Sequence, residues 1–184
     1  ILLITIERDS LTPAPAFNKV LGTIINLLRS VPFLILMMAV TPLTRLILGK
    51  AIGSTATIVP LIIASFPYVA RMVESSLREV DKGVIEAAQS MGSTSMQIIC
   101  KVLLPEALPS LINGATICMT TILAYTAMAG SAGGDGLGKL AIAYGLNRRD
   151  YTVMYTSSVA LVIIVQIIQV IGNALTRAFD HKRR

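Results

Sequence analysis

The chain has 184 residues, of which 54% are hydrophobic and 14% are charged, and its mean hydropathy is +0.73. Soluble domains carry about 25% charged residues, so this composition excludes an ordinary soluble domain and predicts a membrane protein. The formal net charge is +6, but the Lys and Arg residues lie mostly at the edges of apolar runs, which fits membrane topology and not a basic stripe that would bind nucleic acid.

The chain opens with the apolar residues 1–6, which are too few to cross a bilayer. We expect them to be the remnant of a first transmembrane helix that is truncated in this sequence. A polar connector with two prolines follows, and helical periodicity then begins at Lys19. The periodic and apolar residues that continue to Leu48 predict one span over 19–48.

Three further spans are predicted over 54–72, 107–128 and 152–175, because each is apolar and long enough to cross a hydrocarbon core of about 30 Å. Residues 74–106 are too charged to lie in lipid and form a long loop. A glycine-rich turn separates the last two spans. The sequence therefore predicts a single all-α domain over 1–184, a polytopic membrane helix bundle.

The distribution of Lys and Arg predicts the orientation of the spans. If loop 74–106 is cytoplasmic, the parity of the spans places the N-terminal connector and the C-terminal tail in the cytoplasm too. Of the 16 Lys and Arg residues, all but five then lie in the cytoplasm, as the positive-inside rule requires. The five on the outside are Arg45, Lys50, Lys139, Arg148 and Arg149.

The loop is predicted to contain two short helices that meet at Gly92. Residues 84–91 are rich in helix formers, and Gly92 can adopt the left-handed conformation that ends a helix. Thr94 and Gln97 have the spacing of a capping box at the start of a second helix. We expect Pro105 to end that helix. Its apolar stripe is formed by Met96, Ile99, Val102 and Leu103.

The residues Glu86-Ala87-Ala88, then Gly92, then Leu104-Pro105 resemble the EAA loop of bacterial ABC-importer permeases. The resemblance implies two coupling helices that insert into a groove on a cytoplasmic ATPase subunit, which binds and hydrolyses the ATP. The chain itself would be no enzyme and would bind no cofactor. The coupling residues it implies are Glu86, Ala87, Ala88, Gly92, Met96, Leu104 and Pro105. The alternative is that Glu86 is a solvated charge and the two alanines allow close packing.

Further segments resemble methionine-importer permeases, which have five spans. These are Arg29-Ser30-Val31-Pro32-Phe33, residues 101–109, and Gly136-Leu137-Gly138. The resemblance implies a type I ABC-importer permease of the bacterial inner membrane, a homodimer bound to two ATPase subunits and supplied with methionine by an extracytoplasmic binding protein. A permease for another amino acid or small nutrient is the alternative.

Polar residues of the third span are predicted to line the pathway or to join helices. They are Asn113, Thr116, Thr120, Thr121 and Tyr125, with Met119 and Met128 as apolar wall. Arg45 and Glu74 lie near span ends, where snorkelling to the interface would explain them.

Several signals are set aside. Cys100, Cys118 and the lone His181 offer neither a metal site nor a catalytic constellation, so a membrane-embedded enzyme is disfavoured. The segment Gly133 to Lys139 resembles a P-loop, but Leu140 stands where the magnesium-ligating Ser or Thr belongs. We interpret this segment as a flexible extracytoplasmic turn, which would allow it to face the binding protein.

Overall fold

The computed structural model describes residues 15–180, in which every regular element is a helix, as predicted. Residues 1–6 and His181 lie outside the described residues. The elements are α2 (Pro15–Ser30), α3 (Phe33–Leu48), α4 (Ser54–Arg78), α5 (Lys82–Ser90), α6 (Ser95–Ile98), the π-helix η1 (Ile99–Leu103), α7 (Leu104–Ala129), the 3-10 helix η2 (Gly130–Ala132), α8 (Leu137–Lys139), the π-helix η3 (Leu140–Leu146) and α9 (Tyr151–Phe179).

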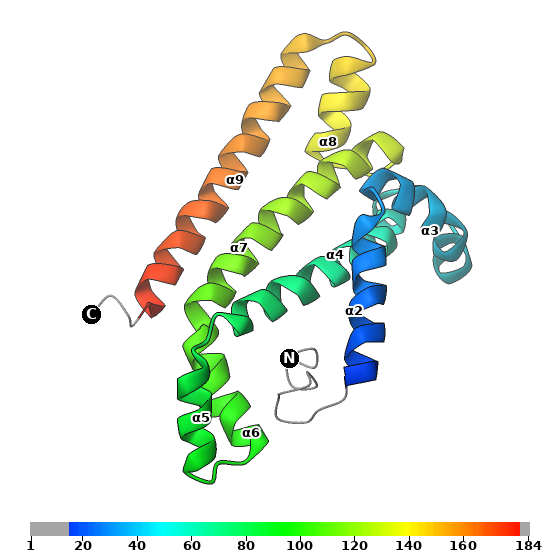
Figure 1. The fold of residues 1–184 in the computed structure, drawn as a ribbon. Coiled ribbons are helices and arrows are strands. Elements are labelled where there is room, and N and C mark those ends of the chain that lie inside the picture. The colour runs from blue at the N-terminus through cyan, green and yellow to red at the C-terminus, as the bar shows by residue number, and fades with distance from the viewer. Residues whose placement is uncertain (1–14, 181–184) are drawn as a thin grey trace.

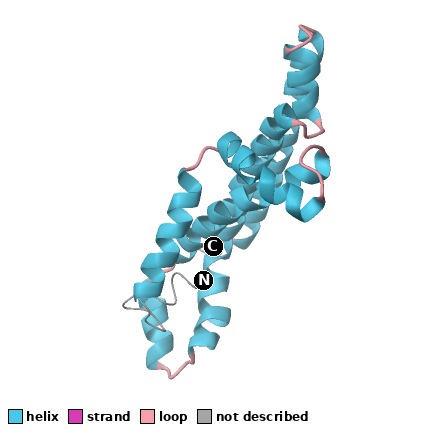
Figure 2. Ribbon diagram, turned by 90° about the vertical axis from the view of Figure 1, so that its right-hand side faces the viewer, coloured by secondary structure: helices cyan, strands magenta, loops and turns pink. Residues whose placement is uncertain are grey.

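Three helices are long and apolar enough to cross a membrane by length and composition: α4, the continuous run Ser95–Ala129, and α9. They contain the three spans predicted after residue 50. The central helix α7 contacts both α4 and α9, and α2 and α3 contact α4 (Figure 1). Figure 2 shows the elongated shape of this arrangement, with one helical hairpin extending from each end.

The first predicted span, over 19–48, is not one helix. It is divided into α2 and α3, whose axes differ by 106°. The break falls at Val31-Pro32, and Pro32 caps the start of α3 with φ −57° and ψ 138°. Proline has no N–H to donate, and it disfavours helical geometry for the residue before it. The residues of the predicted span therefore form two helices, which are long and apolar enough to cross a membrane only when the bent pair is taken as one span.

Glycines allow the long helices to approach closely. A β-carbon added to Gly172 of α9 would lie 2.0 Å from Thr116 Oγ1 of α7, and one added to Gly114 would lie 2.5 Å from Met72 Sδ of α4. A side chain at Gly172 would collide with Thr116, and one at Gly114 would require the Met72 side chain to move. Contacts of this kind are common between membrane helices, where packing replaces the hydrophobic effect as the driving force.

A short helix over Leu137–Leu146 was missed by the sequence analysis, which expected only a turn between the last two spans. It is made of α8 and η3 and packs against α9. Gly145 provides the close contact, since a β-carbon there would lie 2.7 Å from Met154 Cα. The last two long helices are therefore joined by a helical hairpin, shown at the end opposite to α5 and α6 in Figure 1.

Candidate functional site

The predicted coupling loop forms a helical hairpin at one end of the molecule (Figure 1). Because α4 continues to Arg78 and α7 begins at Leu104, the hairpin comprises residues 79–103, fewer than the 74–106 expected. We call it the coupling hairpin. Asp81 caps its first helix, α5, by accepting a hydrogen bond from Gly83 N at 2.6 Å.

The turn of the coupling hairpin has the geometry that the sequence predicts. Gly92 has φ +76°, in the left-handed region, and its N–H donates to Gln89 O at 2.9 Å. Thr94 N–H then donates to Gln97 Oε1 at 2.9 Å, and Gln97 N–H donates to Thr94 Oγ1 at 3.4 Å. The predicted capping box is therefore present, and both ends of the turn are fixed by side-chain or backbone bonds.

The implied coupling residues divide into exposed and buried sets. Glu86, Ala87 and Gly92 are exposed, and Met96 is 70% exposed, whereas Ala88 is buried. Met91, which the sequence analysis passed over, is 79% exposed and precedes the turn. Two exposed methionines thus flank the small, uncharged turn at the tip of the hairpin, among exposed polar side chains. Such a surface is typical of a site that a partner protein covers.

The second helix of the coupling hairpin departs from the prediction. The buried side chains are Ile98 and Leu103, and Met96 is exposed instead of belonging to the apolar stripe. A π-turn causes the shift, because Leu104 N–H bonds Ile99 O, five residues back. Pro105 does not end the helix either. It lies in the first turn of α7, where its missing N–H is tolerated.

The coupling hairpin is joined to the membrane helices by a small hydrophobic core. Its buried members are Leu77 and Val80 at the end of α4, and Leu103 and Ala107 at the start of α7. Leu104 is half-buried against the same core, and Pro105 is exposed. Because close-packed cores transmit displacement with little compression, movement of the hairpin is passed to α4 and α7.

A buried ion-pair network lies above this core. Glu74 is 6% exposed and accepts from Arg71 Nη1 at 2.5 Å and from Arg78 Nη2 at 3.0 Å. Arg71 Nη2 also donates to Gly22 O and Asn26 Oδ1 of α2, at 3.0 and 2.9 Å. The snorkelling explanation for Glu74 was therefore wrong. The carboxylate is held between two guanidinium groups, and the network connects α4 to α2.

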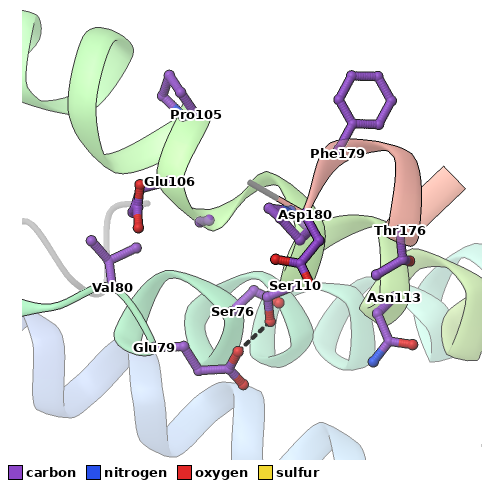
Figure 3. Close-up of a pocket in the computed structure, with 12 residues that line it drawn as sticks. Ser76, Glu79, Val80, Pro105, Glu106, Ser110, Asn113, Thr176, Phe179 and Asp180 are labelled. Carbon is purple, nitrogen blue, oxygen red and sulfur yellow. Dashed lines mark hydrogen bonds between the residues drawn. The ribbon is translucent and has the colours of Figure 1, made fainter. Parts of the chain in front are cut away.

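The start of α7 borders two polar cavities. One, of about 300 Å³, lies between the ends of α4 and α9 (Figure 3). The other, of about 380 Å³, lies between α2, α4 and α7. Both are lined by Glu79, Ser110 and Asn113, and Ser110 Oγ donates to Glu79 Oε2 at 2.5 Å. Asn113, one of the predicted pathway residues, therefore faces open space.

The other predicted pathway residues lie in different surroundings. Thr116 is 8% exposed and packs against Gly172, and Tyr125 stacks on Phe33 with ring centroids 4.7 Å apart. Thr120 Oγ1 donates to the carbonyl of Ile117 in its own helix at 2.9 Å. Helix packing therefore occupies Thr116 and Tyr125. Met119 and Met128 are exposed on α7, as is Asn113.

The glycine-rich segment after α7 is tied in place by an acidic residue. Asp135 accepts from Lys139 Nζ at 2.7 Å and from Ser54 Oγ at the start of α4. These hydrogen bonds, that from Lys139 first, hold the pKa of the Asp135 carboxyl below its usual value. Gly138 packs on the backbone of Ala127, and the two segments can lie this close only because Gly138 has no side chain. These contacts link the turn to the start of α4, and its expected flexibility stays a prediction.

Comparison with known proteins gives a consistent set of relatives. Residues 11–184 match the family described as binding-protein-dependent transport system inner membrane component. The probable D-methionine transport system permease protein MetI of Vibrio cholerae is 53% identical over 182 residues, 99% of this chain and 81% of the relative. The methionine import system permease protein MetP of Bacillus subtilis is 42% identical over 181 residues, 98% and 82% of the two chains. A crystal structure of the MetNI methionine ABC transporter in an inward-facing conformation matches with a TM-score of 0.95 at 44% identity, over 98% of this chain and 83% of the other.

Proposed function

This chain belongs to the family of binding-protein-dependent transport system inner membrane components, and from that premise we propose that it is the permease subunit of an ATP-driven methionine importer. The observation that carries the proposal is the coupling hairpin, whose capped helices present a tip with two exposed methionines at one end of a bundle of membrane-spanning helices. Members of this family are inner membrane components.

We propose that the ATPase subunit covers the tip of the coupling hairpin. The exposed Met91 and Met96 are flexible apolar side chains suited to a partner's groove, and Gly92 between them leaves room for close approach. Glu86 and Ala87 of α5 are both exposed to solvent, whereas Ala88, Leu104 and the core at the root of the hairpin transmit the movement. The chain needs no nucleotide of its own in this scheme.

The assembly we propose contains two copies of this chain and two ATPase subunits, with a binding protein on the far side of the membrane. Support for a second copy comes from α7, whose exposed residues Asn113, Met119 and Met128 have no cover within residues 15–180. Support for the binding protein comes from the opposite hairpin, where the turn at Asp135 is exposed at the end of the bundle away from the coupling hairpin. ATP binding would close the ATPases, displace both coupling hairpins and turn the pathway outward by rigid-body motion.

Co-purification tests the coupling surface. The chain and its ATPase are co-expressed and purified from detergent, as the wild type and as Gly92→Arg. Gly49→Arg is a matched control, because Gly49 has φ +70° and, like Gly92, has no atom within 4 Å of an added β-carbon. The two substitutions strain the backbone to a similar degree, so a loss of the ATPase that occurs only with Gly92→Arg reports on docking and not on folding. We expect the wild type and Gly49→Arg to retain the ATPase and Gly92→Arg to lose it.

Two other outcomes would count against the proposal. Retention of the ATPase by Gly92→Arg would move the docking surface away from this turn, and no retention by the wild type would refute the pairing itself. The substrate is tested separately, by competition for uptake of labelled methionine into cells that express the complete system. Uptake that another amino acid inhibits more strongly than methionine would exclude methionine as the preferred substrate.

A further inference from the structure

The cavity between α2, α4 and α7 has an unusual supply of free polar groups. Arg29, Ser75 and Asn113 line it, and within residues 15–180 none of the three side chains has a hydrogen-bond or ion-pair partner. Glu79 lines it too, and its one described hydrogen bond comes from Ser110. Polar side chains without partners at a cavity wall are groups that a polar ligand can satisfy.

The charged side chains on this wall are those of two arginines and one glutamate. Arg71 also lines the cavity, but its guanidinium is already engaged by Glu74 and by α2. That leaves the guanidinium of Arg29 as the cation open to a ligand and the carboxylate of Glu79 as the acid. A ligand that matches both signs carries a negative and a positive group of its own, as an amino-acid zwitterion does.

The same wall carries an apolar strip. Met72 of α4 and Ile117 of α7 contribute it, with Tyr68 at its far end. The thioether of Met72 is polarizable and adapts to an unbranched side chain. At about 380 Å³, the cavity lies near the lower limit of about 300 Å³ for small-molecule sites, so it suits one small ligand.

We propose that this cavity is a binding site for the amino acid in transit, an inference that rests on the proposed transport function. Glu79 receives the α-ammonium group, and Asn113 and Arg29 receive the α-carboxylate. Asn113 lies one helical turn from Ser110, which bonds Glu79, so the two recognition groups are contiguous on the wall. The side chain of the amino acid lies along Met72 and Ile117.

The location gives the site a role in release. Glu79 caps α4 at the root of the coupling hairpin, next to the packed core that joins the hairpin to α4 and α7. Movement of the hairpin therefore reaches the two walls of the cavity that carry Glu79, at the end of α4, and Asn113 of α7. The proposed site would be held together or pulled apart by the same motion that the ATPase drives.

The test uses the complete complex of permease and ATPase with a methionine analogue whose side chain carries a diazirine for photolabelling. Arg29→Gln and Glu79→Gln are the test variants, and Lys19→Gln is the control, because Lys19 is an exposed cation of α2 that does not line the cavity. Arg29 has no described partner to lose, and glutamine at position 79 keeps an acceptor for Ser110, so both variants should fold.

In the wild type, labelling should map to the segments of α4 and α7 around Met72 and Ile117 and be displaced by unlabelled methionine. Each test variant should weaken it about tenfold, since a hydrogen bond to a charged group is lost. In the wild type, methionine should displace the label better than its methyl ester, which lacks the carboxylate, and Arg29→Gln should abolish this difference. Methionine should also displace the label better than N-acetylmethionine, which lacks the ammonium group, and Glu79→Gln should abolish that difference. Lys19→Gln should do neither.

The proposal fails if both variants are labelled as strongly as Lys19→Gln, or if phospholipid displaces the label and methionine does not. It also fails if these helices are not labelled while the complete system still imports methionine, a result that leaves the transport function intact. Absence of methionine uptake by the wild-type system would instead overturn the transport function, and this site with it.

Discussion

The contact between Gly172 and Thr116 determines how closely α9 packs on α7. A β-carbon at Gly172 would lie 2.0 Å from Thr116 Oγ1, 2.4 Å from its Cγ2 and 2.7 Å from its Cβ. The threonine cannot turn away freely, because its hydroxyl donates to Ile112 O at 2.9 Å and its χ1 is restricted by branching. Gly172→Ala therefore overpacks the interface, and we expect a loss of about 1–3 kcal/mol in stability.

Second-site substitutions make this reasoning refutable. Thr116→Ala removes the two nearest atoms but leaves Cβ at 2.7 Å, so it should rescue Gly172→Ala only in part. Thr116→Gly removes all three atoms and should restore close packing, at a cost of about 1 kcal/mol for glycine in a helix. Stability is measured as the temperature at which purified protein in detergent loses its monodisperse peak, with Asn173→Ala as control. If Gly172→Ala is as stable as the wild type, or Thr116→Gly gives no rescue, the packing argument is wrong.

Three further substitutions test other parts of the molecule. Thr94→Ala should lose the capping box, lower stability by about 0.5–2 kcal/mol and weaken ATPase retention, whereas Ser95→Ala should leave retention unchanged in the same co-purification assay. Glu74→Gln leaves Arg78 without its carboxylate and should lower the thermal stability by about 1–3 kcal/mol; an unchanged unfolding temperature would show that the network is not stabilising. Asp135→Asn should speed hydrogen exchange in the turn that follows α7. A carboxyl with a lowered pKa stabilises the folded state fully above the ordinary Asp pKa of about 3.9, and it loses this effect only as the pH falls through the lowered value. In the wild type, the local opening that permits hydrogen exchange in this turn should therefore not increase between about pH 5 and 8.

Local chemistry made much of the coupling hairpin predictable. The left-handed Gly92 and the capping box of Thr94 and Gln97 depend on residues within one or two turns of each other, so spacing in the sequence is enough to identify them. The break at Pro32 was equally local, since proline without an N–H sits at the start of α3. The sequence analysis predicted one span over 19–48 without placing a bend at this proline.

The apolar runs of the sequence determined that the chain is a helical membrane protein, because burial in lipid requires long helices that satisfy their own backbone groups. Other features depended on residues far apart in the chain. The exposure of Met91, the burial of Glu74 between two arginines and the pairing of Thr116 with Gly172 arise only when helices pack. From the sequence alone, a threonine in a span can be predicted either to line a pathway or to pack against another helix, because the neighbouring helix is not known. The tertiary structure decided which, because Thr116 is buried and lies so close to Gly172 that an added β-carbon would be 2.0 Å from its Oγ1, which leaves no room for a pathway there.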